Sequence, residues 1–184
     1  MMTKILVLYH SSHGSVANMA AEFAETITVN GGEAVVRVFK AREPHDVEVT
    51  KADLVACDGL AFGTPTRFGM MAAEAKTFWE TTSDLWLKGQ LIDKPACVFS
   101  SSSSMHGGNE ATLLNLSLPL LHHGMMLLGV PYDVPELLSS QTGGTPYGAS
   151  HVAGSQNDAT LSATEVKICR AAASRLLRVA EKLK

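Results

Sequence analysis

The chain opens with a short, unbroken run of apolar residues. Residues 4–9, Lys-Ile-Leu-Val-Leu-Tyr, show no alternation of polar and apolar positions, which is typical of a strand buried on both faces of a parallel sheet. Residues 15–30 then repeat apolar side chains at helical spacing. Gly31 and Gly32 follow, and glycine commonly ends a helix. The pattern therefore predicts a strand followed by a helix.

The same alternation of strands and helices continues to the C-terminus. Four more strands are predicted at residues 33–39, 59–63, 96–100 and 126–130. Further helices are predicted at residues 71–81, 109–123 and 162–183, the last opening on a Ser162–Glu165 capping box. Such alternation predicts one α/β domain over residues 1–184, with helices on both faces of a parallel sheet. Five strands favour the order 2-1-3-4-5, in which ligands bind at the carboxyl ends of the strands beside the first.

One long stretch follows neither period. Residues 131–157 are rich in Gly, Pro, Ser and Thr. A connection of this length is usually functional or disordered. We therefore expect it to be a loop that helps to cover a site.

The loop between the first strand and the first helix suits a phosphate. Serine hydroxyls and the free N–H groups of a helix start can donate to an anion, and the helix dipole adds positive potential. The loop matches neither the dinucleotide-binding nor the P-loop fingerprint and carries no Lys or Arg, which suits a phosphomonoester. The predicted contacts are Ser11, Ser12, His13, Gly14, Ser15 and Val16. Taken alone, the same residues would equally suit an ordinary capped turn.

Two further loops are expected at the same edge of the sheet. The loop after the third strand would present Arg67 and Phe68 at its rim, as a planar ring system requires. The loop after the fourth strand is serine-rich and contains glycines, so its backbone N–H groups can approach a ligand edge. Each loop could instead be an exposed turn. The predicted cofactor contacts here are Pro65, Thr66, Arg67, Phe68, Gly69, Ser100, Ser101, Ser102, Ser103, Ser104, Met105, His106 and Gly107.

Charge and cysteine content limit the partners and the cellular compartment that the sequence suggests. A net charge of −3 offers no basic face for nucleic acid. The three cysteines are scattered and form no Cys-x-x-Cys pair, which favours a reducing cytoplasm. No apolar run is long enough to span a bilayer, so membrane contact is expected to be peripheral at most.

The residues in these loops, with several others, resemble the WrbA-type NAD(P)H:quinone oxidoreductases. This is a flavodoxin-like FMN family first named for binding the tryptophan repressor. The resemblance covers essentially the whole chain, and its specific blocks are residues 63–69, 122–125 and 143–149. It implies a flavodoxin-like three-layer sandwich and a tightly but non-covalently bound FMN. It also implies NADH or NADPH as co-substrate, a quinone as electron acceptor, and a homodimer or homotetramer.

The resemblance also implies roles for the loops. Residues 11–16 would hold the FMN phosphate, residues 66–68 would contact the ribityl chain and ring, and residues 101–107 would border the ring edge. Residues 143–149 resemble a loop that closes the site at the tetramer contact.

Single residues outside these loops receive roles in the same way. His122 is placed at the flavin, contributed by a neighbouring subunit, and His123 takes that role if the alignment shifts by one position. Trp86 resembles an aromatic wall over the ring, where nicotinamide and quinone bind in turn. His13, Phe68 and Trp86 would thus form the substrate side.

The predicted function is two-electron hydride transfer from NAD(P)H through FMN to a quinone. No side chain is needed as a strong acid or base, because the cofactor carries the chemistry. The main alternative is a flavodoxin-type electron carrier without its own substrate, although such carriers are typically strongly acidic. A regulatory partner of a repressor rests only on the family's old name. No His, Cys and carboxylate cluster has zinc spacing, so no metal is expected.

Overall fold

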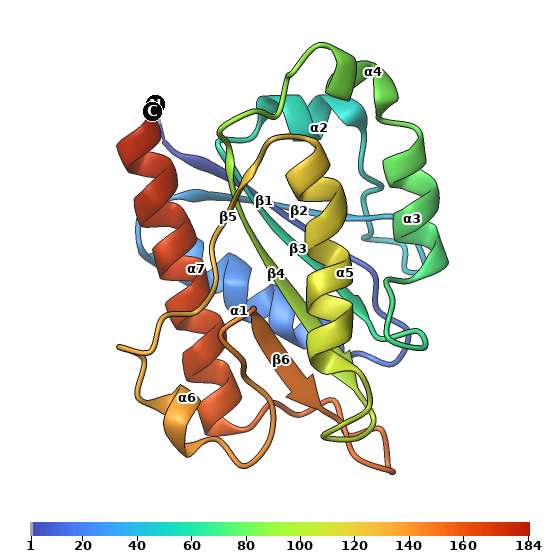
Figure 1. The fold of residues 1–184 in the computed structure, drawn as a ribbon, viewed down its shortest axis with the longest axis vertical. Coiled ribbons are helices and arrows are strands. Elements are labelled where there is room, and N and C mark those ends of the chain that lie inside the picture. Colours follow the sequence, from blue (N-terminus) through green and yellow to red (C-terminus); the bar gives the residue numbers. More distant parts are fainter. Residues whose placement is uncertain (1) are drawn as a thin grey trace.

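A parallel sheet forms the middle layer of the computed structural model, which describes residues 2–184 (Figure 1). Its path runs in the order β2-β1-β3-β4-β5, and this confirms the predicted architecture and strand order. The strands are β1 (Lys4–Tyr9), β2 (Glu33–Val38), β3 (Gly59–Pro65), β4 (Pro95–Ser102), β5 (Met126–Leu127) and β6 (Ala149–Val152).

The fifth position of the sheet is divided between two strands. β5 pairs with Pro95 and Ala96 at the start of β4, whereas β6 pairs with residues 99–102 at its end. The prediction of one strand over 126–130 was therefore wrong in its length. Val130 leaves the ladder because its N–H donates to the Pro146 carbonyl instead. Residues 128–148 are thus an insertion within the last strand position, and β6 brings the chain back to the edge where ligands are expected.

The helices form the two outer layers. One face carries α1 (Ser15–Val29) and α7 (Ala163–Leu183), which pack side by side. The opposite face carries α2 (Lys51–Ala56), α3 (Ala73–Glu80), α4 (Ser83–Leu87) and α5 (Asn109–His122), while α6 (Glu136–Ser139) packs against α7.

The unbroken apolar run of β1 is explained by this arrangement. Ile5 and Val7 face the core beneath α1 and α7, whereas Leu6 and Leu8 face the core beneath α3 and α5. All four side chains are fully buried, so the strand has no solvent-facing side to mark with polar residues.

Two helix starts differ in a way that matters for the site. α7 begins with the predicted capping box, in which Ser162 and Glu165 satisfy one another's backbone N–H groups. α1 begins at Gly14 with a φ of 94° and no side-chain cap. Its first-turn N–H groups are therefore free to bind something else.

The short helices α2, α4 and α6 were not predicted, and α6 and β6 lie within residues 131–157, which were expected to be a loop. α2 spans one and a half turns, too few for an apolar stripe, although Thr50 and Asp53 form a capping box at its start. Within residues 2–184 no helix is both long and apolar enough to cross a membrane. Cys57, Cys97 and Cys169 are free thiols buried in the two cores.

Candidate functional site

The three predicted loops meet at the carboxyl ends of the strands. They enclose a cavity of about 200 Å³ beside the start of α1. The lining residues are Ser11, Ser12, His13, Ser15, Val16, Pro65, Thr66, Arg67, Ser101, Ser102, Ser103, Ala153 and Asn157. We refer to this cavity as the phosphate pocket.

The first loop is built to receive an anion. Gly14 adopts a left-handed conformation, and its N–H donates to Ser11 Oγ at 3.2 Å. A Cβ at Gly14 would lie 3.3 Å from the Cβ of Ala159, so a larger residue is opposed both by backbone strain and by crowding. The first turn of α1 contains no acidic residue. Free N–H groups, the helix dipole and nearby hydroxyls together fit a phosphate.

The second loop adds a positive charge that the first loop lacks. Arg67 Nη2 donates to Ser12 Oγ at 2.7 Å, and its Nη1 donates to the Thr66 carbonyl at 3.0 Å. The guanidinium therefore bridges two loops across the mouth of the pocket. Phe68 is fully exposed with a φ of 53°, which leaves its ring available to a flat ligand.

Hydrogen bonds lock this second loop onto its neighbours. The Thr66 hydroxyl accepts from the Gly69 N–H at 3.2 Å and from the Thr112 hydroxyl at 2.7 Å. The Thr66 N–H donates to the Ser101 carbonyl at 2.8 Å. The second and third loops are thus held at fixed separation.

The third loop only partly lines the pocket. Ser101, Ser102 and Ser103 face it. Ser100 was predicted as a contact, but it is fully buried and its hydroxyl donates to the Thr64 carbonyl at 2.9 Å. Four further predicted contacts lie beyond the residues that line the pocket: Ser104, Met105, His106 and Gly107. Gly69 is likewise outside the lining.

A buried histidine supports the first loop from behind. His10 Nε2 lies 3.3 Å from Ser12 Oγ, 3.4 Å from Arg42 Nη2 and 3.9 Å from Glu74 Oε2. Burial lowers the pKa of His10, and the opposing effect of Glu74 does not restore it. The histidine is therefore neutral near pH 7, and Arg67 is the positive charge that reaches the pocket.

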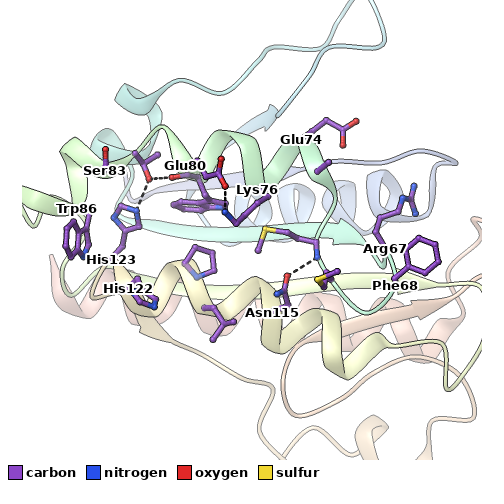
Figure 2. A pocket seen from close by; sticks show the side chains of 17 residues that line it. Arg67, Phe68, Glu74, Lys76, Glu80, Ser83, Trp86, Asn115, His122 and His123 are labelled. Atoms are coloured by element: carbon purple, nitrogen blue, oxygen red, sulfur yellow. Dashed lines mark hydrogen bonds and ion pairs between the residues drawn. The ribbon is translucent and has the colours of Figure 1, made fainter.

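A second cavity of about 950 Å³ lies between α3 and α5 (Figure 2). Arg67 and Phe68 lie at one end of it, and Trp86, His122 and His123 lie at the other. The latter three belong to α4 and the C-terminal end of α5, at the opposite end of the sheet from the phosphate pocket. Within one chain, Trp86 and His122 are therefore kept away from the cofactor loops. We call this cavity the α3–α5 groove.

The structure distinguishes the two adjacent histidines. His123 is buried, and its Nε2 lies 2.9 Å from Thr82 Oγ1. The Thr82 hydroxyl already donates to the Trp79 carbonyl at 2.7 Å, so His123 must be the donor. His122 is exposed in the α3–α5 groove, whereas His123 lines the same groove with its ring buried.

Two lining residues of the phosphate pocket were missed by sequence reasoning. Ala153 and Asn157 follow β6, inside the stretch expected to be a loop. No periodicity marks them, and only the pairing of β6 with β4 brings them to the pocket. Asn157 has a φ of 53°, a conformation that Asn tolerates better than most residues.

Comparison with known proteins agrees with this geometry. The model of the NADPH-dependent FMN reductase family matches residues 3–132. Two proteins named NAD(P)H dehydrogenase (quinone), from Gluconacetobacter diazotrophicus and Chromohalobacter salexigens, are 38% and 39% identical over 99% of this chain and 99% of their own.

Solved structures of flavodoxin-like proteins share this fold. A WrbA-like flavodoxin from Agrobacterium tumefaciens superposes with a TM-score of 0.75 and 25% identity over 99% of both chains. A flavodoxin from the domain Archaea, at 18% identity, covers 98% of this chain and 99% of its own with a TM-score of 0.63, which supports the fold alone. This chain therefore belongs to the NADPH-dependent FMN reductase family, among relatives named NAD(P)H dehydrogenase (quinone), as its sequence blocks predicted.

Proposed function

We propose that this protein is an FMN-dependent NAD(P)H:quinone oxidoreductase. The observation that carries the proposal is the uncapped start of α1, beside which residues of three loops line one pocket. Bound there, FMN supplies two-electron hydride chemistry, which side chains alone cannot provide. The names of the relatives support the choice of nicotinamide and quinone as substrates.

The residues of this chain bind and orient rather than exchange protons. Residues 11–16 hold the phosphate through N–H groups and hydroxyls, and Arg67 adds a charge-assisted contact. The backbone of residues 101–103 faces the ligand where β4 ends. No catalytic acid or base is assigned.

The size of the phosphate pocket limits what it can hold. A cavity of about 200 Å³ is smaller than the 300–1,000 Å³ typical of sites that enclose a whole ligand. It suits the phosphate and part of the ribityl chain, so the flavin ring would lie outside it, next to the exposed Phe68. The ring then needs another surface to cover it and exclude water.

A second copy of the chain is the proposed source of that surface. Exposed leucines at positions 114, 118 and 121 give α5 an apolar outer face in addition to its buried one. A helix that is apolar all round is normally buried. A homodimer or homotetramer formed through this face would bring Trp86 and His122 of one copy to the flavin of another, where nicotinamide and quinone bind in turn.

The decisive experiment follows the flavin absorbance without oxygen. The protein is reconstituted with FMN, and NADH or NADPH is added. Bleaching by either nicotinamide, followed by recovery of the absorbance on adding benzoquinone, is the expected result. If neither nicotinamide bleaches the flavin, the oxidoreductase proposal fails and the electron-carrier alternative gains.

The net charge and the free thiols support a proposal for the cellular location and the partners. We place the enzyme in the cytoplasm, where its three free cysteines stay reduced. Its net charge of −3 supports neither a nucleic-acid partner nor docking as a strongly acidic carrier. Any contact with a membrane-borne quinone would be peripheral.

A further inference from the structure

The segment 153–159 carries a feature that the proposed function does not use. It follows β6, contributes Ala153 and Asn157 to the phosphate pocket, and leads into α7. Three contacts fasten it. The Ala153 N–H donates to the Ser102 carbonyl at 2.8 Å, and the Asn18 side chain donates to the Ala159 carbonyl at 2.9 Å.

The third contact comes from a buried charge pair. His151 Nε2 lies 2.8 Å from the Asp158 carbonyl, and His151 Nδ1 lies 3.0 Å from Glu165 Oε2. Both side chains are at least 97% buried. Because each ring nitrogen faces an oxygen that can only accept, both nitrogens must carry protons. The geometry therefore requires the imidazolium form.

Glu165 is satisfied on both oxygens. Oε1 accepts from the N–H groups of Gly143 and Val152 at 3.0 and 3.1 Å, while Oε2 accepts from the Ser162 N–H at 2.8 Å as well as from His151. A carboxylate with this many donors is fixed in place. It thereby ties the 128–148 insertion, β6 and the start of α7 to one point.

We propose that Asn157 is a contact for the cofactor phosphate and that the His151–Glu165 pair is the positioning device that holds Asn157 there. The segment lies directly over Gly14, since Ala159 is the nearest neighbour of a Cβ built at that glycine. The primary amide of Asn157 offers two donors, which suit an anion held at the start of α1. This inference rests on the proposed FMN site.

The charged and titratable groups that face His151 come from two elements. Glu165 lies on α7, and Asp158 lies in the segment itself. The Cys169 thiol, one turn after Glu165 on α7, is affected by Glu165 and not by His151. Burial lowers the pKa of His151, but its bonds to Glu165 and Asp158 outweigh burial and raise the pKa above its ordinary value. Burial keeps the pKa of the Cys169 thiol well above its ordinary value, so this thiol stays neutral.

Deprotonation of His151 has a defined consequence. The neutral ring can keep only one N–H donor, and the carboxylate of Glu165 is a stronger acceptor than the Asp158 carbonyl. The bond to the segment is therefore the one that is lost. FMN affinity should fall as the pH rises through the pKa of His151.

The test titrates the full-length protein, freed of flavin, with FMN and with riboflavin, which lacks the phosphate. Asn157→Gly removes the amide while tolerating the positive φ, and Gln156→Gly is the matched control, because Gln156 lies beside it but does not line the pocket. We expect Asn157→Gly to weaken FMN binding about tenfold and to leave riboflavin binding unchanged. Gln156→Gly should alter neither.

The pH profile tests the positioning role. Wild type should lose FMN affinity towards alkaline pH, whereas Asn157→Gly and His151→Gln should not show this loss. Titration of the FMN phosphate and of His10 is common to all three proteins and cancels in the comparison. If His151→Gln does not fold, the comparison of the pH profiles of wild type and Asn157→Gly still tests the positioning role.

Each result separates the two proposals. If wild type does not bind FMN, the proposed function fails. If wild type binds FMN but Asn157→Gly binds it equally well, or weakens riboflavin as much as FMN, the phosphate contact is overturned while the function stands. If wild type and Asn157→Gly share one alkaline profile, the positioning role of His151 is overturned.

Discussion

At the scale of single residues, Gly14 shapes the start of α1 beside the phosphate pocket. Its left-handed φ turns the backbone into α1, and its missing side chain leaves room for Ala159 and a ligand. The sequence predicted Gly14 as one of the phosphate contacts. It could not indicate that a distant segment presses on the same point, because that contact spans more than 140 residues of chain.

Gly14→Ala should therefore weaken FMN binding at least tenfold, in addition to a cost of about 1 kcal/mol in the free energy of unfolding from the positive φ. Gly31→Ala is the matched control. Gly31 also has a positive φ, but nothing lies within 4 Å of a Cβ there. Urea unfolding and flavin-fluorescence titration of both variants separate strain from binding. Equal loss of FMN affinity in both would contradict the role of Gly14.

The hydrogen-bonded carboxylate of Glu165 should make the stability of the protein fall at acid pH. Burial raises its pKa, but hydrogen bonds from His151, Ser162 and Val152 outweigh burial and bring the pKa to about 2, against 4.5 for the unperturbed group. A folded-state pKa below the unfolded value stabilises the protein above the unfolded value, and this contribution is lost as the pH falls towards 2. Urea midpoints of wild type should therefore fall between about pH 5 and about pH 3 more steeply than those of Glu165→Gln. Parallel curves would refute the assignment.

At the scale of elements, α5 shows where periodicity alone is ambiguous. Its buried leucines, at positions 113, 116 and 120, mark the core face, while those at 114, 118 and 121 are about half exposed. The sequence predicted the helix but not which leucines are buried and which are exposed, since both sets repeat at helical spacing. Packing against β3 and β4 decides that.

Leu118→Glu should break the oligomer, because it puts a charge into an apolar contact. Leu183→Glu is the matched control, since Leu183 has the same 53% exposure but lies at the end of α7, away from the α3–α5 groove. Sedimentation at low concentration should show a smaller species for Leu118→Glu only. An unchanged assembly in that variant would exclude this face as the contact.

At the scale of the whole molecule, the residues proposed for the site lie at the two opposite ends of the sheet. The cofactor loops lie at the carboxyl ends of the strands, whereas Trp86 and His122 lie at the other. Helices that follow parallel strands run back across the sheet, so residues at their far ends are always remote from the ligand edge. Under the proposed function, a complete site would therefore combine the loops of one copy with Trp86 and His122 of another.

Trp86→Ala should lower quinone turnover much more than FMN retention. Co-expression of the Trp86→Ala chain with a Gly14→Ala chain should recover part of the activity. Some sites in the mixed oligomers then combine an intact first loop from one chain with an intact Trp86 from the other. Steady-state turnover of the mixture against each variant alone measures this. No recovery, with mixed oligomers present, would mean that both residues serve one chain's site.

The sequence by itself determined the alternation of the main strands and helices, the strand order and the flavodoxin-like family. These depend on local periodicity and on contiguous motifs, which can be read directly from the order of residues. The tertiary structure decided the division of the last strand position, the arrival of Arg67 at Ser12, and the removal of Ser100 into the sheet. It also decided the placing of Asn157 in the phosphate pocket and of Ala159 beside Gly14. Each of these depends on contacts between residues far apart in the chain, which sheet pairing creates and no local pattern records.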